Sequence, residues 1–199
     1  MTKGVKRRTS ESGYSLIEMM VVVGVSGVLA GMAVFQVGSA RAGMNGDAAL
    51  RAVMAQMNQA RETSITQRRN MRMAFELGNR VQIIREEINP VPPMTATTVV
   101  STTYFEGNVQ YVKLVTADTP DTFGNSSTTG VNLPTATGTP PEVKFSPEGK
   151  FLNQDGASVN GTIFIGMVNQ PLSARAITIM GSTGRIRAYR WDGLKWVQV

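Results

Sequence analysis

Near its start the chain carries a long apolar run that predicts a membrane-spanning helix. From Met19 to Val37 there is no charged residue, and Gln36 is the one strongly polar side chain. A helix that crosses a bilayer needs about 20 predominantly apolar residues. We therefore expect a hydrophobic helix over residues 14–38 that stores the protein in a membrane.

A second helical pattern follows this run. Apolar positions recur near the 3.6-residue period of a helix between Asp47 and Arg69. They are Leu50, Val53, Met57 and Ile65, with Ala60 and Ser64 between them. This spacing predicts an amphipathic helix over residues 39–70 that packs its apolar stripe against a sheet. Gly43 and Gly46 are expected to loosen the junction between the two helical halves.

After residue 70 the pattern changes to short strands separated by turn residues. Gly78-Asn79 and Asp192-Gly193 are two-residue hairpin signals, and Asn89–Pro93 breaks the chain into a loop. Residues 118–141 are rich in Thr, Gly, Asn, Ser and Pro, which predicts a long exposed loop. The expected strands are Met71–Leu77, Arg80–Glu87, Val99–Phe105, Val109–Val115, Val143–Phe145, Lys150–Leu152, Thr162–Val168, Ala174–Met180, Arg185–Trp191 and Leu194–Val199. The fold class is therefore α+β, with a β-rich domain over residues 71–199.

Charge is placed unevenly around the apolar run. Four basic residues precede it, at Lys3, Lys6, Arg7 and Arg8, with Glu11 as the one acidic residue beside them. Basic residues before an apolar segment hold that end in the cytoplasm, so the β-rich domain is expected on the other side of the membrane. Glu18 lies just inside the run, where a charge costs roughly 2.5–3.5 kcal/mol on insertion scales and indicates a functional role.

The composition argues against an enzyme. The 199 residues include no cysteine and no histidine, which removes the commonest thiol nucleophile, the commonest general base and the usual zinc ligands. No metal site and no cofactor are expected. The net charge of +6 includes +3 from residues 1–13, so the rest of the chain is only modestly basic.

The junction Gly13-Tyr14-Ser15-Leu16-Ile17-Glu18 resembles the class III leader of type IV prepilins and pseudopilins. Gly13 matches the small residue before the cut, Tyr14 replaces the usual phenylalanine that becomes N-methylated, and Glu18 matches the glutamate at the fifth mature position. The resemblance implies the pilin fold, in which one long N-terminal helix packs on antiparallel β-sheets. It also implies that residues 1–13 are a leader removed by a prepilin peptidase.

The same resemblance implies a role for Glu18. In the family this carboxylate pairs with the new N-terminal amine of a neighbouring subunit, because an unpaired charge in lipid is costly. The expected partners are the peptidase, other pilin or pseudopilin subunits, the inner-membrane assembly platform and the inner membrane itself. The protein would then move from the membrane into a pilus or pseudopilus.

Two further patterns refine this resemblance. Phe145–Gly149, Gly161–Ile165, Ala176–Ile179 and Gly184–Arg187 are similar in order to the C-terminal half of the GspH/FimT-type family, which contains minor pilins and a type II secretion pseudopilin. Gly24, Gly27 and Gly31 punctuate the apolar run, and such glycines let helices approach closely in lipid. They are equally consistent with glycine simply tolerated in a membrane helix.

Three other interpretations compete for the N-terminal segment. The first is an ordinary secretory signal cleaved near Ser39–Ala42, although its apolar core would be about 7–15 residues. The second is a plain single-span anchor, which leaves Gly13-Tyr14 and Glu18 unexplained. The third is a secreted soluble enzyme whose mature N-terminus lies beyond Val37.

The C-terminal hairpin supplies an alternative function. On an extended strand alternate residues share a face, so Arg185, Arg187, Tyr189 and Trp191 are expected on one side, with Arg190 on the other and Lys195 on the returning strand. A basic and aromatic surface binds nucleic acid through phosphates and stacked bases. Some FimT-type minor pilins bind DNA for natural transformation through C-terminal arginines. The competing interpretation is a solvated strand with arginines at a subunit interface.

Overall fold

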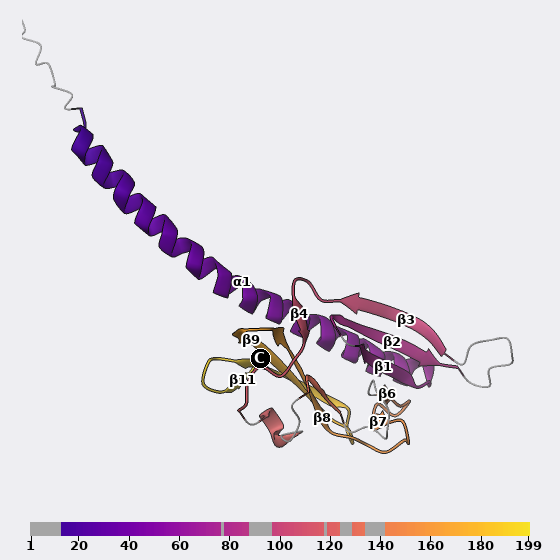
Figure 1. Cartoon of the computed structure of the whole chain (residues 1–199). Helices are drawn as coiled ribbons and strands as arrows, with labels where there is room; N and C mark the ends of the chain where they lie inside the picture. Colours follow the sequence, from indigo (N-terminus) through magenta and orange to yellow (C-terminus); the bar gives the residue numbers. More distant parts are fainter. Residues whose placement is uncertain (1–12, 77, 88–96, 118, 124–128, 134–141) are drawn as a thin grey trace, which may run out of the picture. The chain divides into compact units, whose positions relative to one another are not determined.

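The computed structural model describes residues 13–76, 78–87, 97–117, 119–123, 129–133 and 142–199. Residues 1–12 of the expected leader and the expected Asn89–Pro93 loop therefore lie outside the described residues. The helix α1 extends from Leu16 to Gln67 (Figure 1). The chain divides into two compact units, Met1–Gly38 and Ser39–Val199.

The first unit contains the N-terminal part of α1. Leu16–Ala33 is long and apolar enough to cross a membrane, and none of this window is buried within the protein. Tyr14, Leu16 and Ile17 are all largely exposed. A helical surface this apolar needs lipid or other helices around it, in agreement with the predicted span.

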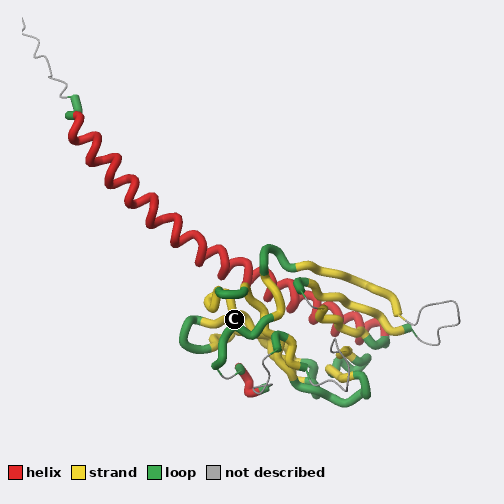
Figure 2. The backbone as a smooth tube through the Cα atoms, viewed as in Figure 1, coloured by secondary structure: helices red, strands yellow, loops and turns green. Residues whose placement is uncertain are grey.

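The second unit contains two antiparallel sheets, seen as separate groups of strands in Figure 2. The first sheet has the strand order β3-β2-β1-β6-β7. Its strands are β1 (Met71–Glu76), β2 (Arg80–Glu86), β3 (Thr97–Tyr104), β6 (Glu142–Phe145) and β7 (Phe151–Asn153). The second sheet has the order β11-β10-β9-β8-β4, and β5 also pairs with β8. Its strands are β4 (Val109–Tyr111), β5 (Val131–Asn132), β8 (Gly161–Met167), β9 (Gln170–Met180), β10 (Arg185–Trp191) and β11 (Trp196–Gln198), and a single 3-10 turn, η1, covers Pro120–Thr122.

One hydrophobic core joins the C-terminal part of α1 to both sheets. Leu50, Val53 and Met57 of the predicted stripe are buried in it, together with side chains from β1, β8 and β9. Ile65 was expected to extend the stripe but is 45% exposed. Ser64 is buried instead, and its one hydroxyl proton is shared between the carbonyls of Arg61 at 2.7 Å and Ser146 at 3.0 Å. The last packed turn of the helix therefore contacts the turn after β6 through a hydrogen bond from Ser64 and not through an apolar side chain.

Most predicted strands are confirmed, including the β1–β2 and β10–β11 hairpins. Two expectations need correction. The strand expected over Val109–Val115 ends at Tyr111. The region expected as an exposed loop over residues 118–141 is not uniformly exposed, because Thr119, Pro120 and Leu133 are buried. Apolar and turn-forming residues in the described part of this segment pack onto the second sheet. Its content of Thr, Gly, Asn, Ser and Pro does not reveal this packing.

Gly43 and Gly46 do not loosen α1, which is helical through both. They are contact points with β9. A Cβ added to Gly46 would lie 2.5 Å from the carbonyl oxygen of Ser173, whereas one added to Gly43 would meet only the Arg175 guanidinium, at 3.9 Å. Gly46 is therefore a position where the helix backbone packs directly against the backbone of β9.

The two glycines should respond oppositely to alanine. Gly46→Ala forces backbone to move and should destabilise the protein by about 1–3 kcal/mol, since overpacking has that cost. Gly43→Ala has room and gains helix propensity, so it should be neutral or stabilise by up to about 1 kcal/mol. Urea unfolding of both variants measures the difference. Equal destabilisation by the two would contradict this packing.

Arg175 on β9 connects the sheet to the helix. Its side chain is only 2% exposed. Nε donates to Asp47 Oδ1 at 2.6 Å, Nη2 donates to the Gly43 carbonyl at 3.0 Å, and Nη1 donates to the carbonyls of Leu172 and Ala174 at 2.9 Å. A buried charge is tolerated only when it is paired and hydrogen-bonded, and this arrangement meets both conditions. The guanidinium thus fixes the first turns of the globular part of α1 against β9.

Candidate processing and docking site

The predicted processing residues surround the beginning of α1. Gly13 and Tyr14 precede the helix in exposed chain without regular secondary structure, and Tyr14 is 80% exposed. A peptide bond in such a segment is accessible to a protease, because no hydrogen-bonded structure has to open first. The geometry is thus compatible with cleavage after Gly13.

Ser15 caps the helix at this end. The backbone N–H of Glu18 donates to Ser15 Oγ at 3.2 Å, and the N–H of Met19 donates to the Ser15 carbonyl. Ser15 and Glu18 thus have the spacing of a capping box, in which serine satisfies the third helical N–H. The sequence contained this Ser-x-x-Glu signal, but its capping role was not predicted. The cap fixes where the helix starts and so places Glu18 in its first turn.

Glu18 is exposed on the first turn of the helix. A carboxylate there is favoured by the partial positive charge of the helix N-terminus. In the described part of the chain no basic side chain forms an ion pair with it. Among the described residues, the carboxylate of Glu18 is therefore left without a basic partner.

Gly24, Gly27 and Gly31 share one face of the helix. Their spacings of three and four residues place them above one another, and no atom lies within 4 Å of the position of a Cβ on any of them. Within the described residues this face is open, and its use in close helix packing in lipid stays a prediction.

The candidate DNA-binding residues do not form the expected surface. Tyr189 and Trp191 are 7% and 9% exposed, so their rings are not available for stacking on bases. Tyr189 packs with Phe164 and Ala176 in a small cluster on the second sheet. Arg185 and Arg190 lie at opposite ends of β10, about 17 Å apart along a strand, and Lys195 lies in the turn before β11. The expected exposure of Tyr189 and Trp191 is therefore wrong, because their rings are used for packing, whereas DNA binding by Arg185, Arg187, Arg190 and Lys195 stays a prediction.

Arg187 is engaged by a carboxylate from the long connection. Its Nη1 donates to Asp121 Oδ1 at 3.0 Å, and Thr178 Oγ1 donates to Asp121 Oδ2 at 2.7 Å. Burial alone would raise the pKa of Asp121, but hydrogen bonds from Thr178 and Tyr189 and the charge of Arg187 outweigh it and hold that pKa below its ordinary value. Asp121 also adopts a φ of 59°, a conformation uncommon outside glycine. This carboxylate attaches η1 to β9 and β10.

The Asp121 contact predicts a pH dependence. Because its pKa is lowered on folding, its contribution is present above the unfolded value of about 3.9 and is lost as pH falls through the folded value. Asp121→Asn removes this titrating group. The wild type should therefore lose more stability than the variant between pH 5 and pH 2.5, as measured by urea unfolding at each pH. Parallel stability curves for the two proteins would contradict the contact.

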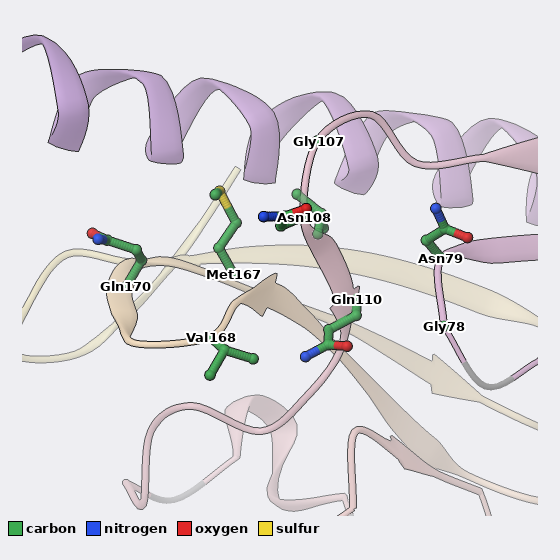
Figure 3. Close-up of a pocket in the computed structure, with 9 residues that line it drawn as sticks. Gly78, Asn79, Gly107, Asn108, Gln110, Met167, Val168 and Gln170 are labelled. Carbon is green, nitrogen blue, oxygen red and sulfur yellow. The ribbon is translucent and has the colours of Figure 1, made fainter.

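A groove of about 570 Å³ lies beside β4 in the second unit (Figure 3). Its polar side chains are carboxamides, from Asn79, Asn108, Gln110 and Gln170, and Met167 and Val168 supply apolar surface. None of the residues that line it ionises, so these side chains offer hydrogen bonds but no acid, base or charged nucleophile. Among the described residues there is also no cluster of side chains suited to a metal ion.

Comparison with known proteins identifies the N-terminal segment. Residues 8–34 match the family model described as the prokaryotic N-terminal methylation motif. No curated protein and no solved structure matches the chain. The motif covers the junction at Gly13-Tyr14, the carboxylate of Glu18 and most of the apolar run. Together with the long helix and antiparallel sheets, it supports a type IV pilin-like protein with a prepilin-type leader, anchored in a membrane by its apolar helix.

Proposed function

We propose that this protein is a minor pilin or pseudopilin of the GspH/FimT type, which is incorporated into a type IV pilus or a type II secretion pseudopilus and primes or caps its assembly. A prepilin peptidase of the inner membrane cuts after Gly13, and the new amine of Tyr14 is methylated. Before assembly, the mature subunit is a single-span membrane protein with its globular unit in the periplasm. Its work is assembly, without turnover of a substrate.

The observation that carries this proposal is the methylation motif at residues 8–34 on a helix whose surface is left open. In an assembled filament, apolar helices of neighbouring subunits would cover that surface. Glu18 would pair with the amine of Tyr14 on a neighbour, and the face of Gly24, Gly27 and Gly31 would allow helices to approach closely. The order of the C-terminal strand motifs supports the GspH/FimT assignment.

The burial of Tyr189 and Trp191 and the engagement of Arg187 by Asp121 weigh against the alternative of a DNA-binding pilin. Strong phosphate binding needs free cations that release counterions. On this hairpin the central arginine already has a carboxylate partner.

The proposal is tested by the location of the protein in its native host. Surface filaments are sheared from cells and purified, and the chain is quantified there and in the membrane fraction. A matched strain that lacks the prepilin peptidase is the control. We expect the chain in the filament or pseudopilus fraction of the wild type and in the membrane fraction alone in the control. Equal partition in the two strains would overturn the proposal.

A further inference from the structure

One end of the globular unit gathers exposed apolar side chains from three separate segments. Met44 on α1 is 71% exposed, Leu172 at the start of β9 is 52% exposed, and Leu194 in the β10–β11 turn is 89% exposed. Exposed apolar residues are common singly, but a group of them together with basic residues marks a contact surface.

The contacts within the globular unit place these segments at the same end. The guanidinium of Arg175 donates to the carbonyls of both Leu172 and Gly43, the residue before Met44. A Cβ on Gly193, the residue before Leu194, would lie 3.8 Å from the Leu172 side chain. The segment of α1 around Gly43, the beginning of β9 and the tip of the C-terminal hairpin therefore lie side by side.

Basic side chains accompany this apolar group. Arg41 on α1 and Lys195 beside Leu194 are both exposed. The nearby carboxylates are already occupied: Asp47 accepts from Arg175, and Asp192 accepts from the backbone N–H groups of Leu194 and Lys195. We define Arg41, Met44, Leu172, Leu194 and Lys195 as the basal surface. Apolar side chains with basic neighbours are the combination that binds an anionic lipid surface.

The chain itself limits how far the basal surface can be from a bilayer. Arg41 lies four positions after Val37, the last residue of the apolar run, and even a fully extended chain of four residues spans at most about 14 Å. The headgroup layer adds roughly 5–7 Å to each side of the hydrocarbon core. Because the apolar helix anchors the protein, the end of the globular unit that carries Arg41 is the end within reach of lipid headgroups.

We propose that the basal surface contacts the headgroup layer of an anionic membrane while the subunit is anchored there. Leu194 at the hairpin tip enters the interface, and Arg41 and Lys195 pair with lipid phosphates. The contact would hold the globular unit against the membrane before assembly and would be released when the subunit leaves the bilayer. This inference rests on the membrane anchoring and does not require that the subunit enters a filament.

The chain provides its own probe, because its two tryptophans, Trp191 and Trp196, both lie on the hairpin that carries Leu194. The mature chain is reconstituted into vesicles of phosphatidylcholine with phosphatidylglycerol, whose acyl chains are either plain or brominated next to the headgroup. Bromine quenches tryptophan only at close range. We expect roughly a twofold loss of emission in brominated vesicles, and the loss should shrink when phosphatidylglycerol is omitted.

Two variants make the experiment decisive. Leu194→Asp should abolish most of the quenching, whereas Val99→Asp, at an exposed apolar position on β3, should leave it unchanged. Absence of quenching in the wild type, or equal quenching in Leu194→Asp, would overturn the proposal. Emission that changes with protein density but not with bromination would show that another copy of the protein covers the surface, and would also overturn it. Vesicles contain no assembly machinery, so failure here leaves the filament proposal to its own test.

Discussion

Arg175→Met should lower the free energy of unfolding by about 3–5 kcal/mol, the cost of breaking a buried ion pair by removing one partner. The guanidinium is nearly inaccessible and donates to Asp47 and to three backbone carbonyls. Methionine fills much of the space but donates nothing, so the carboxylate and the carbonyls lose their partners together. Urea or thermal unfolding of the purified protein measures the loss.

The control is Arg187→Met on the neighbouring strand. Arg187 also pairs with an aspartate, at 3.0 Å, but its side chain is 35% exposed. Water screens an ion pair that is this exposed, so it stabilises much less than a buried pair, and this variant should lose far less than Arg175→Met. If both variants lost the same free energy, the claim that Arg175 fixes α1 against β9 would fail.

Glu18→Ala should reduce the amount of the protein in the filament fraction roughly tenfold or more, while cleavage after Gly13 continues. A pair between this carboxylate and a neighbour's N-terminal amine in an apolar surrounding is strongly stabilising relative to one unpaired charge. A tenfold change corresponds to only about 1.4 kcal/mol, which is less than the cost of leaving one buried charge unpaired. Quantitative blotting of sheared filaments and membranes measures the ratio.

Ser15→Ala is the matched control for Glu18. It removes the cap that accepts the Glu18 N–H and should cost about 1 kcal/mol of helix stability, but it leaves the carboxylate in place. We expect this variant to enter filaments nearly as well as the wild type. Equal loss in both variants would show that the start of the helix matters and that the charge does not.

Local patterns in the sequence were sufficient for the long helix and most of the strands, but not for η1 and β5. The apolar run from Met19 to Val37 indicated the spanning helix, and the 3.6-residue period at Leu50, Val53 and Met57 indicated the face that packs on the sheets. Gly78-Asn79 and Asp192-Gly193 located two hairpins correctly. Each of these signals lies within a few residues of what it predicts.

The contacts that organise the globular unit are long-range, and no local pattern reports them. Arg175 and its partner Asp47 are 128 positions apart, and Arg187 and Asp121 are 66 apart. Alternation on β10 predicted the shared face of Arg187 and Tyr189, but it could not say that other parts of the chain cover that face. For the same reason the sequence suggested that Gly46 loosens the helix, whereas its backbone packs directly against β9.

Docking through Glu18 requires that the mature chain begins at Tyr14. Mass spectrometry of the protein purified from the membranes of its host answers this directly, by identifying the N-terminal peptide. We predict a chain that starts at Tyr14 with a methylated amine and retains the entire apolar run. An N-terminus beyond Val37, or an intact leader in cells with an active prepilin peptidase, would contradict a pilin-like protein that docks through Glu18.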